Sequence, residues 1–258
     1  MKNVFAILLL FIIGCKGTDK TISMPGAYKM LSQSAKSDKT DTTYTSREQL
    51  KIFTEDYMMY ANVNPSDSSS SFGIGTYTST GDSLTENVIY TSSDSTSNDT
   101  LRNFTLLIEK TSKGFKQVIP EMNFNGQIWK WTEEYESVGS SAKTSLDGTW
   151  KMVKRFAIKG KDTTIYNNVQ YKTYFGGFVI WGHTWSDSLN KIQTGIGYGK
   201  FEMTGNKVKE SMTSSTYSSV RGHDFDIDIT LNGKDEFTQS MIDPDGTKTS
   251  ETYMRLKK

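Results

Sequence analysis

Short runs in which apolar and polar residues alternate follow one another from residue 24 to the end of the chain. Clusters of Gly, Asn, Asp, Ser and Pro separate the runs. Alternation with a period of two is typical of strands that bury one face, and the cluster residues are typical of turns. The pattern therefore predicts an all-β protein built from many short antiparallel strands.

The first half of the chain, residues 24–137, contains eight such runs. Residues 32–43 predict a polar loop after the first run, and Ile52, Thr54 and Tyr57 favour a strand over a helix in residues 48–59. Eight strands separated by turns are the pattern of an up-and-down barrel or a sandwich. The runs are Tyr28–Leu31, Leu50–Phe53, Tyr57–Val63, Phe72–Tyr77, Leu84–Tyr90, Phe104–Ile108, Phe115–Ile119 and Trp129–Tyr135.

The second half, residues 146–258, repeats the first. Its opening Gly148–Met152 echoes Gly26–Met30, roughly 120 positions earlier, which predicts a duplicated domain. The small polar residues 138–145 predict a short flexible linker between the copies. Further landmarks recur in the same order: Asp41–Thr43 as Asp162–Thr164, Tyr57–Tyr60 as Phe178–Trp181, Gly73–Tyr77 as Gly197–Phe201, Glu86 as Glu210, and Phe104–Ile108 as Phe225–Ile229.

Alternation is clearest in the second copy. In Asp224–Leu231, branched and aromatic residues alternate with three aspartates and a threonine. On the opening strand, Trp150, Met152, Phe156 and Ile158 are expected to share one face, because residues two apart point the same way.

The first fifteen residues predict where the protein is located rather than how it folds. Met1–Asn3 is basic, and Val4–Ile13 is an apolar run too short to cross a bilayer as a helix, but suited to a signal peptide. The run ends in Ile13-Gly14-Cys15, which resembles a bacterial lipobox. The resemblance implies cleavage before Cys15 and acylation of that cysteine; a secreted protein without an anchor is the alternative.

We therefore expect a signal peptide at residues 1–14, a lipidated tether at residues 15–23, and a membrane as partner through Cys15. Lys16 follows the cysteine, where some Gram-negative bacteria read an acidic residue as a retention signal. The resemblance thus favours an outer-membrane lipoprotein of the cell envelope, and it leaves the leaflet open.

Composition narrows the chemistry. The 258 residues carry a formal net charge of +1, which argues against a nucleic-acid partner because such a partner needs a clustered basic face. One cysteine and two histidines exclude a disulfide within the chain and the thiolate and imidazole zinc sites. Neither a metal nor another cofactor is predicted.

The ends of the second copy resemble those of the lipocalin-like (calycin) barrels, which open on Gly-x-Trp and end on an arginine that lies across the tryptophan. Gly148-Thr149-Trp150 matches the opening, and Arg255 stands on the last strand. The first copy has Tyr28 in place of tryptophan and Ser137 in place of arginine. More narrowly, the chain resembles small bacterial lipocalin-like lipoproteins of unassigned function.

This resemblance implies two tandem eight-stranded antiparallel up-and-down barrels, at residues 24–137 and 146–258. Trp150 and Arg255 would close the second barrel, because such a barrel brings its first and last strands together. Eight strands leave an interior wide enough for one small ligand.

The sequence gives only weak indications of a catalytic or ion-binding site. Asp224, Asp226 and Asp228 could hold Ca²⁺, but residues two apart on a strand are too extended to wrap an ion, so a solvated outer face is favoured. Gly195–Gly199 lacks the helix that a phosphate loop needs, and its glycines are better explained by a bend in a strand.

Glu133, Glu134 and Glu136 could be paired acids, but a charged strand edge is the commoner case. Neither histidine lies in a known nucleophile motif. No catalytic residue is predicted, and the chain is not expected to be an enzyme.

Trp181, His183 and Trp185 form the strongest candidate site. They share one strand face, and Tyr198 is expected on the next strand; the four would contact a ligand or simply pack. The third strands, Tyr57–Tyr60 and Phe178–Trp181, are apolar on both faces. Their outer faces should be covered by the other barrel or by a partner, although alternation alone leaves open which face points inward.

The preferred hypothesis is thus an envelope lipoprotein that binds a small apolar or amphipathic molecule inside a barrel. The alternative is a structural or accessory subunit of an envelope complex, with barrels filled by side chains. An enzyme on the same scaffold is a third hypothesis, which polar groups converging in a lumen would favour.

Overall fold

The computed structural model describes residues 22–45, 48–64, 70–92, 102–124, 126–140, 142–242 and 245–258. The predicted signal peptide and Cys15 lie outside these residues. Every regular element in the described ranges is a β-strand, as the alternation predicted. Within these ranges, no helix is long and apolar enough to cross a membrane.

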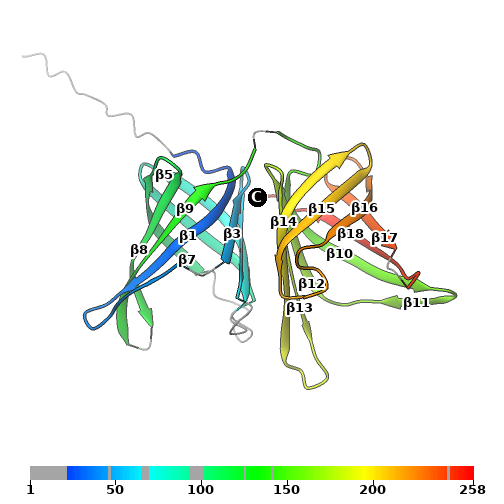
Figure 1. The fold of residues 1–258 in the computed structure, drawn as a ribbon, viewed down its shortest axis with the longest axis horizontal. Helices are drawn as coiled ribbons and strands as arrows, with labels where there is room; N and C mark the ends of the chain where they lie inside the picture. Colours follow the sequence, from blue (N-terminus) through cyan, green and yellow to red (C-terminus); the bar gives the residue numbers. More distant parts are fainter. Residues whose placement is uncertain are drawn as a thin grey trace, which may run out of the picture.

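The described strands form two closed eight-stranded antiparallel barrels in tandem, each with an extra strand, consistent with a lipocalin-like fold (Figure 1). In barrel 1 the order is β1-β3-β4-β5-β6-β7-β8-β9, and pairing of β9 with β1 closes it. Its strands are β1 (Gly26–Lys36), β2 (Asp41–Tyr44), β3 (Glu48–Phe53), β4 (Tyr57–Val63), β5 (Ser71–Thr80), β6 (Ser83–Thr91), β7 (Arg102–Lys110), β8 (Gly114–Phe124) and β9 (Gln127–Ser137).

Barrel 2 repeats this topology strand for strand. Pairing of β18 with β10 closes it, and β11 is the extra strand. Its strands are β10 (Gly148–Lys159), β11 (Asp162–Ile165), β12 (Val169–Phe175), β13 (Phe178–Ser186), β14 (Ile192–Thr204), β15 (Lys207–Ser215), β16 (Asp224–Leu231), β17 (Glu236–Ile242) and β18 (Lys248–Arg255).

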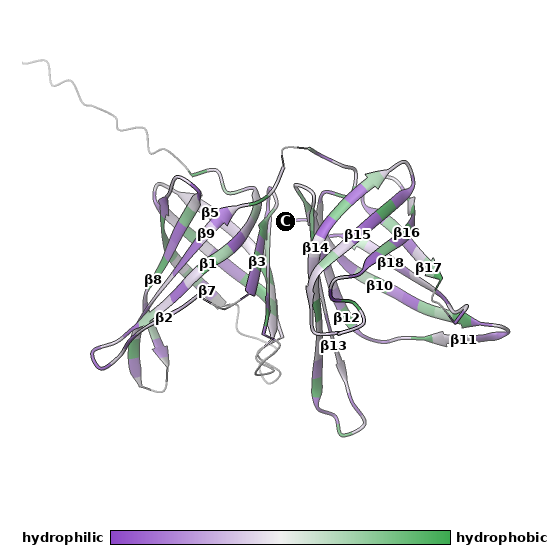
Figure 2. Ribbon diagram, viewed as in Figure 1, coloured by the Kyte–Doolittle hydropathy of each residue, from purple (hydrophilic) through white to green (hydrophobic). Residues whose placement is uncertain are grey.

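The polar loop expected at residues 32–43 is wrong. Strand β1 continues to Lys36, and β2 pairs with its second half as a hairpin that projects from the barrel. Most of this hairpin's outer part is exposed, as is all of β11 in barrel 2. A strand without a buried face has no need of apolar residues, so these segments are largely hydrophilic in Figure 2 and lack the alternation that identified the others.

A β-bulge overturns one predicted strand face. The register of β10 against β18 shifts between Met152 and Lys154, and β1 shifts at the matching place against β9. An inserted residue reverses which side chains point inward. Arg155 and Ala157 therefore face the barrel interior with Trp150 and Met152, and the expectation that Phe156 and Ile158 do so is wrong.

Trp150 and Arg255 meet where barrel 2 closes. The two residues pair directly across β10 and β18, and the guanidinium carbon lies 4.0 Å from the centre of the indole ring. Arg255 also donates hydrogen bonds to the carbonyls of Asp147 (2.7 Å) and Lys234 (2.8 Å). Gly148 has a φ of 144°, and a Cβ there would collide with this guanidinium, so only glycine fits.

Barrel 1 closes without an arginine. Tyr28 pairs with Ser137 at the equivalent place, and its hydroxyl donates to the carbonyl of Met24 at 3.1 Å. In barrel 2 the Trp150 indole makes the same contact with Leu146, also four residues earlier, at 2.8 Å. The capping hydrogen bond is thus kept in both copies, whereas the cation–π contact belongs to barrel 2.

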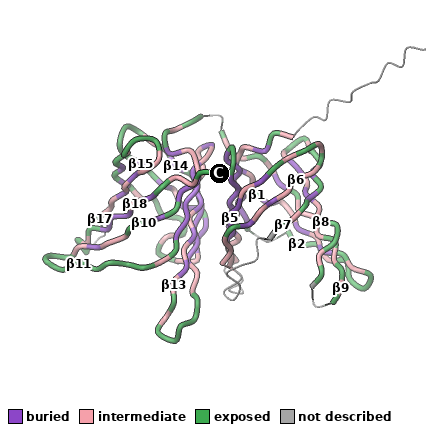
Figure 3. Tube along the Cα trace, turned by 180° about the vertical axis from the view of Figure 1, so that it is seen from behind, coloured by how far each residue is buried: buried purple, intermediate pink, exposed green. Residues whose placement is uncertain are grey.

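The two barrels share an apolar interface. Figures 1 and 3 show the β3–β5 wall of barrel 1 facing the β12–β14 wall of barrel 2, with buried residues concentrated between them. The outer faces of the third strands are therefore covered by the other barrel, which was one of the two expected outcomes. The buried residues of this shared cluster are Ala27, Leu50, Ile52, Met59, Ala61, Val63, Phe72, Ile74, Tyr171, Ile180, Ile196 and Tyr198.

Polar contacts frame the interface. Ser214 donates to Glu48 at 2.8 Å, and the hydroxyls of Tyr90 and Thr184 are hydrogen-bonded to each other. The linker, expected to be flexible, is tied to both barrels at its start. Val138 donates to Ala27 of barrel 1 at 2.9 Å, and the Ser140 amide donates to Gly176 of barrel 2 at 2.8 Å.

We predict that Gly182→Ala destabilises the whole protein through this interface. A Cβ on Gly182 would lie 2.5 Å from the Phe72 ring of barrel 1, and overpacking of this kind costs about 1–3 kcal/mol. Guanidinium unfolding followed by tryptophan fluorescence measures the loss, and Lys200→Ala on the exposed part of β14 is the control. An unchanged free energy of unfolding for Gly182→Ala would contradict a tight interface.

Candidate functional site

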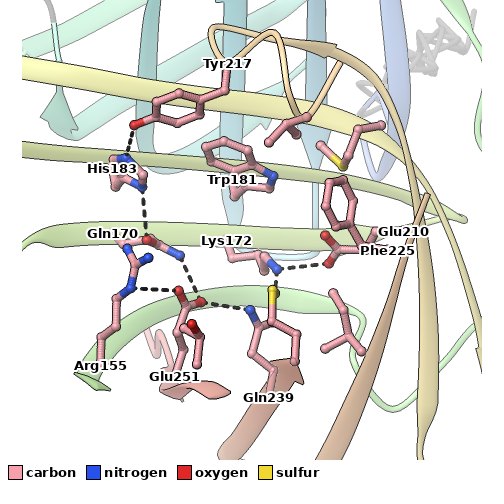
Figure 4. A pocket seen from close by; sticks show the side chains of 15 residues that line it. Arg155, Gln170, Lys172, Trp181, His183, Glu210, Tyr217, Phe225, Gln239 and Glu251 are labelled. Atoms are coloured by element: carbon pink, nitrogen blue, oxygen red, sulfur yellow. Dashed lines mark hydrogen bonds and ion pairs between the residues drawn. The ribbon is translucent and has the colours of Figure 1, made fainter. Parts of the chain in front are cut away.

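A cavity of about 220 Å³ lies inside barrel 2 (Figure 4). Its walls come from β10, β12, β13, β15, β16, β17, β18 and the connection between β15 and β16. The lining residues are Arg155, Gln170, Lys172, Trp181, His183, Glu210, Met212, Tyr217, Val220, Phe225, Ile227, Gln239, Met241, Thr249 and Glu251.

The lining divides into an apolar part and a polar part. Trp181, Met212, Phe225, Ile227 and Met241 contribute the apolar side chains and belong to, or pack against, the interior core of the barrel. In Figure 4, Gln170, Lys172, Glu251 and Gln239 form a connected polar group on one side of the indole, and His183 and Tyr217 lie beside it. The site therefore suits a molecule with one apolar and one polar end.

Lys172 is at the centre of the polar part. Its ammonium is almost fully buried, lies 2.9 Å from a carboxylate oxygen of Glu210, and donates to Gln239 at 3.0 Å. Tyr174 also donates to the Glu210 carboxylate. A buried charge is tolerated only when it is paired and hydrogen-bonded, and these contacts satisfy that condition.

Glu251 collects a second set of donors. Its carboxylate accepts hydrogen bonds from Gln239 (2.8 Å), Tyr253 (2.6 Å) and Gln170 (3.3 Å), and its other oxygen lies 3.3 Å from Nε of Arg155. Burial, together with these nearby carboxylates, raises the pKa of the Tyr174 and Tyr253 hydroxyls well above the usual range. Both tyrosines therefore stay protonated and act as donors.

His183 and Tyr217 join across the outer edge of the cavity. Nδ1 of His183 lies 3.2 Å from the Gln170 amide oxygen, and Nε2 lies 2.8 Å from the Tyr217 hydroxyl. An amide oxygen only accepts, so Nδ1 carries the proton and Tyr217 donates to Nε2. Burial, and to a lesser extent the Arg155 charge, lowers the His183 pKa to about 4, so the ring is neutral at neutral pH.

The cavity continues outward into a mouth of about 370 Å³. Arg155, His183 and Tyr217 line both spaces, so the His183–Tyr217 hydrogen bond lies at the boundary. The Arg155 guanidinium stacks on Tyr166, 4.8 Å from the ring centre. Nε of Arg155 is buried and lies 3.3 Å from the Glu251 carboxylate, without a well-aligned hydrogen bond.

Three of the four candidate ligand residues come together. Trp181 and His183 line the cavity and Trp185 lines the mouth, all from the inner face of β13. Tyr198 points the other way, into the interface between the barrels. The structure therefore does not bring Tyr198 to this cavity, because even positions of β14 face outward.

The glycines of β14 make room for the site. A Cβ on Gly197 would overlap the Trp181 indole, and one on Gly195 would overlap His183 and Tyr217. Inward side chains from β13 thus lie across glycines of the neighbouring strand. This clearance adds a reason for the Gly195–Gly199 run beyond the expected strand bend.

Barrel 1 contains the same polar network at the equivalent positions. Lys51 pairs with Glu86 and donates to Gln117 (3.2 Å), which donates to Glu133 (2.6 Å). Tyr135 completes the set, with its hydroxyl donating to Glu133 at 2.7 Å. Glu133 is therefore an interior acid and not a strand-edge charge, which corrects the expectation for that residue.

The other candidate sites find ordinary explanations. Asp224 and Asp228 are exposed and pair with Lys209 (2.7 Å) and Lys207 (2.8 Å) on the adjacent strand. No group of three or more metal-binding side chains occurs in the part of the chain that the structure describes. The aspartate row is thus a solvated outer face, as favoured.

Sequence reasoning missed most of the polar lining. Glu86 and Glu210 were recognised as repeated landmarks without a role, and Gln49-x-Lys51 recurs as Gln170-x-Lys172. A charged residue repeated within an apolar strand of both copies was the available signal. Arg155 could not be found this way, because the bulge reverses its face.

No protein-family model matches the chain, and no curated protein matches it either. The function must therefore be argued from the site itself.

We predict that His183 makes stability fall as the pH falls. Its folded pKa of about 4 is below the unfolded value of 6.5, so the unfolded chain takes up the proton first, between these two values. His183→Asn, which removes the titratable ring and keeps a polar side chain, should reduce the loss of stability between pH 7 and pH 5. Urea unfolding at both pH values measures it.

The other histidine, His223, is exposed and provides the control. His223→Asn should keep the wild-type pH dependence. An identical pH dependence in wild type and His183→Asn would show that His183 does not carry this effect.

Proposed function

We propose that this protein is a membrane-anchored envelope lipoprotein that holds a small amphipathic molecule in barrel 2. The observation that supports it is the cavity of about 220 Å³ with its open mouth. An interior filled by side chains would instead have favoured the accessory-subunit hypothesis.

The lining suggests the orientation of such a ligand. An apolar tail would lie against Trp181, Phe225 and Ile227, where it leaves water. A polar or anionic head would lie at the mouth, which the positively charged Arg155 side chain lines. Opening of the His183–Tyr217 hydrogen bond would let the molecule pass between mouth and cavity.

The polar network favours binding over catalysis. Polar groups do converge in the lumen, as the enzyme hypothesis requires. However, the central Lys172 is fully engaged with Glu210 and Gln239, and the same arrangement recurs in barrel 1 around Lys51. A lysine whose charge is neutralised in the same way in both copies is better explained by a structural role inside the barrel than by a catalytic role.

The anchor determines which way the mouth faces. In Figure 1 the first described residues and the linker lie at the upper end, whereas β11 and the β13–β14 hairpin, which flank the mouth, project from the lower end. Residues 15–21 span at most about 25 Å when extended. An acylated Cys15 would thus hold the upper end near the membrane and direct the mouth away from it.

An accessory role with an envelope protein partner remains the second candidate, for a specific reason. Ile165, Tyr166 and Val169 are exposed at the end of β11 and the start of β12, close together in the chain, and Tyr166 lines the mouth. Leu189 and Ile192 are exposed on the β13–β14 hairpin. Neighbouring apolar side chains that stay exposed are common at contact surfaces.

We predict saturable quenching of tryptophan fluorescence on titration with decanoate, an anionic amphiphile. Trp181→Phe should lose most of the quenching, because that indole lines the cavity. Trp129→Phe in barrel 1 is the matched control and should keep it. Saturable quenching that Trp181→Phe leaves untouched would place the ligand elsewhere.

We also predict that Cys15→Ala releases the protein from the membrane. The acyl chains provide the anchor in this proposal, and several chains hold far more firmly than one. Partition into a detergent phase should be lost in the variant and kept in Lys16→Ala. A variant that remains in the membrane fraction would refute the anchor.

A further inference from the structure

The two barrels share their central network but differ around it. Pairing across the closing strands sets Gln33 opposite Glu133 in barrel 1 and Arg155 opposite Glu251 in barrel 2. Gln33 therefore occupies the place of Arg155.

Two further positions follow in the same way. Asn62 lies opposite Gln49, as His183 lies opposite Gln170. Trp131 pairs with Ala35 of β1, as Thr249 pairs with Ala157 of β10. Arg155, His183 and Thr249 all line the cavity of barrel 2, so their three counterparts belong to one end of the barrel 1 interior.

These three residues of barrel 1 carry polar atoms without partners. Oε1 of Gln33, Oδ1 of Asn62 and Nε1 of Trp131 are buried and have no hydrogen-bond partner, and Gln33 is only 7% exposed. Buried polar groups are nearly always hydrogen-bonded, so each of these points to a missing partner. In barrel 2, by contrast, both ring nitrogens of His183 are engaged.

The charges also differ. In barrel 2 Glu251 faces the Arg155 cation. In barrel 1 Lys51 pairs with Glu86, whereas the donors to Glu133 among the described side chains are the neutral Gln33, Gln117 and Tyr135. Among the described residues of that interior, one carboxylate therefore has no cation.

We propose that barrel 1 holds a second ligand site, which takes a small hydroxylated amine. A protonated amine would donate to the Gln33 and Asn62 oxygens and would pair with Glu133, which has no cationic partner among the described side chains. The indole of Trp131 adds a face that attracts cations, and its N–H would donate to the ligand hydroxyl. The proposal stands independently of the amphiphile in barrel 2.

The indole N–H signals of the protein labelled with ¹⁵N-tryptophan test this proposal directly. The Trp131 signal, assigned by its loss in Trp131→Phe, should shift saturably with ethanolamine. Ethylene glycol and glycolate, the neutral and anionic analogues of similar size, should leave it unchanged. An unshifted Trp131 signal up to 50 mM ethanolamine, or an equal shift with ethylene glycol, would overturn the proposal and leave ordered water as the partner.

Exchange of residues between the barrels completes the test. Gln33→Arg places the barrel 2 residue in barrel 1, sets a cation opposite Glu133, and should abolish the response to ethanolamine. The reciprocal Arg155→Gln should leave that response intact, since it changes only barrel 2. The other four indole signals report whether each variant is folded, and a folded Gln33→Arg that still responds would refute the site.

Discussion

Each barrel is organised around a buried lysine–carboxylate pair. A closed sheet has no edge and only one interior, so a lysine placed on the inner face must find its counter-charge across the lumen. Lys172 meets Glu210 from β15, and Lys51 meets Glu86 from β6. Removal of one partner from a buried pair typically costs about 3–5 kcal/mol, although the intact pair adds little net stability.

The pair belongs to a wider polar layer inside barrel 2. Gln239 links Lys172 to Glu251 within this layer. Apolar residues of the lining lie next to it on the same strands, Met212 on β15 and Met241 on β17. A polar layer of this kind costs less free energy beside water or a ligand than against hydrocarbon, and the cavity of barrel 2 lies against it.

Comparison of the two copies distinguishes the features that both barrels share from those that only one barrel has. The network and the aromatic stacks are the same in both copies: Phe115 on Tyr135 in barrel 1 and Phe237 on Tyr253 in barrel 2. The copies differ at their closure, where only barrel 2 has the Trp150–Arg255 contact, and inside the lumen, where Arg155 and His183 take the places of Gln33 and Asn62. Each barrel also covers part of the outer surface of the other.

Local sequence patterns predicted the strands and the duplication, and the resemblance to lipocalin-like barrels predicted the strand order. Alternation marks a half-buried strand wherever it occurs, so all eight main strands of each copy were identified, and the ordered landmarks predicted the second barrel from the first. The side chains of Trp181, His183 and Trp185 were grouped correctly, since residues two apart on one strand share a face whatever the fold.

Only the tertiary structure decided which face is the inside and which distant residues meet there. Alternation assigns residues to two faces of a strand but does not say which face points into the barrel. Tyr198 was therefore expected beside Trp181, but it lies between the barrels. A bulge of one residue changed the phase of β10 and brought Arg155 inward in place of Phe156. Barrel closure brought Lys172, Glu210 and Glu251 together from strands far apart in the chain, and no local pattern encodes a contact that depends on the closed shape.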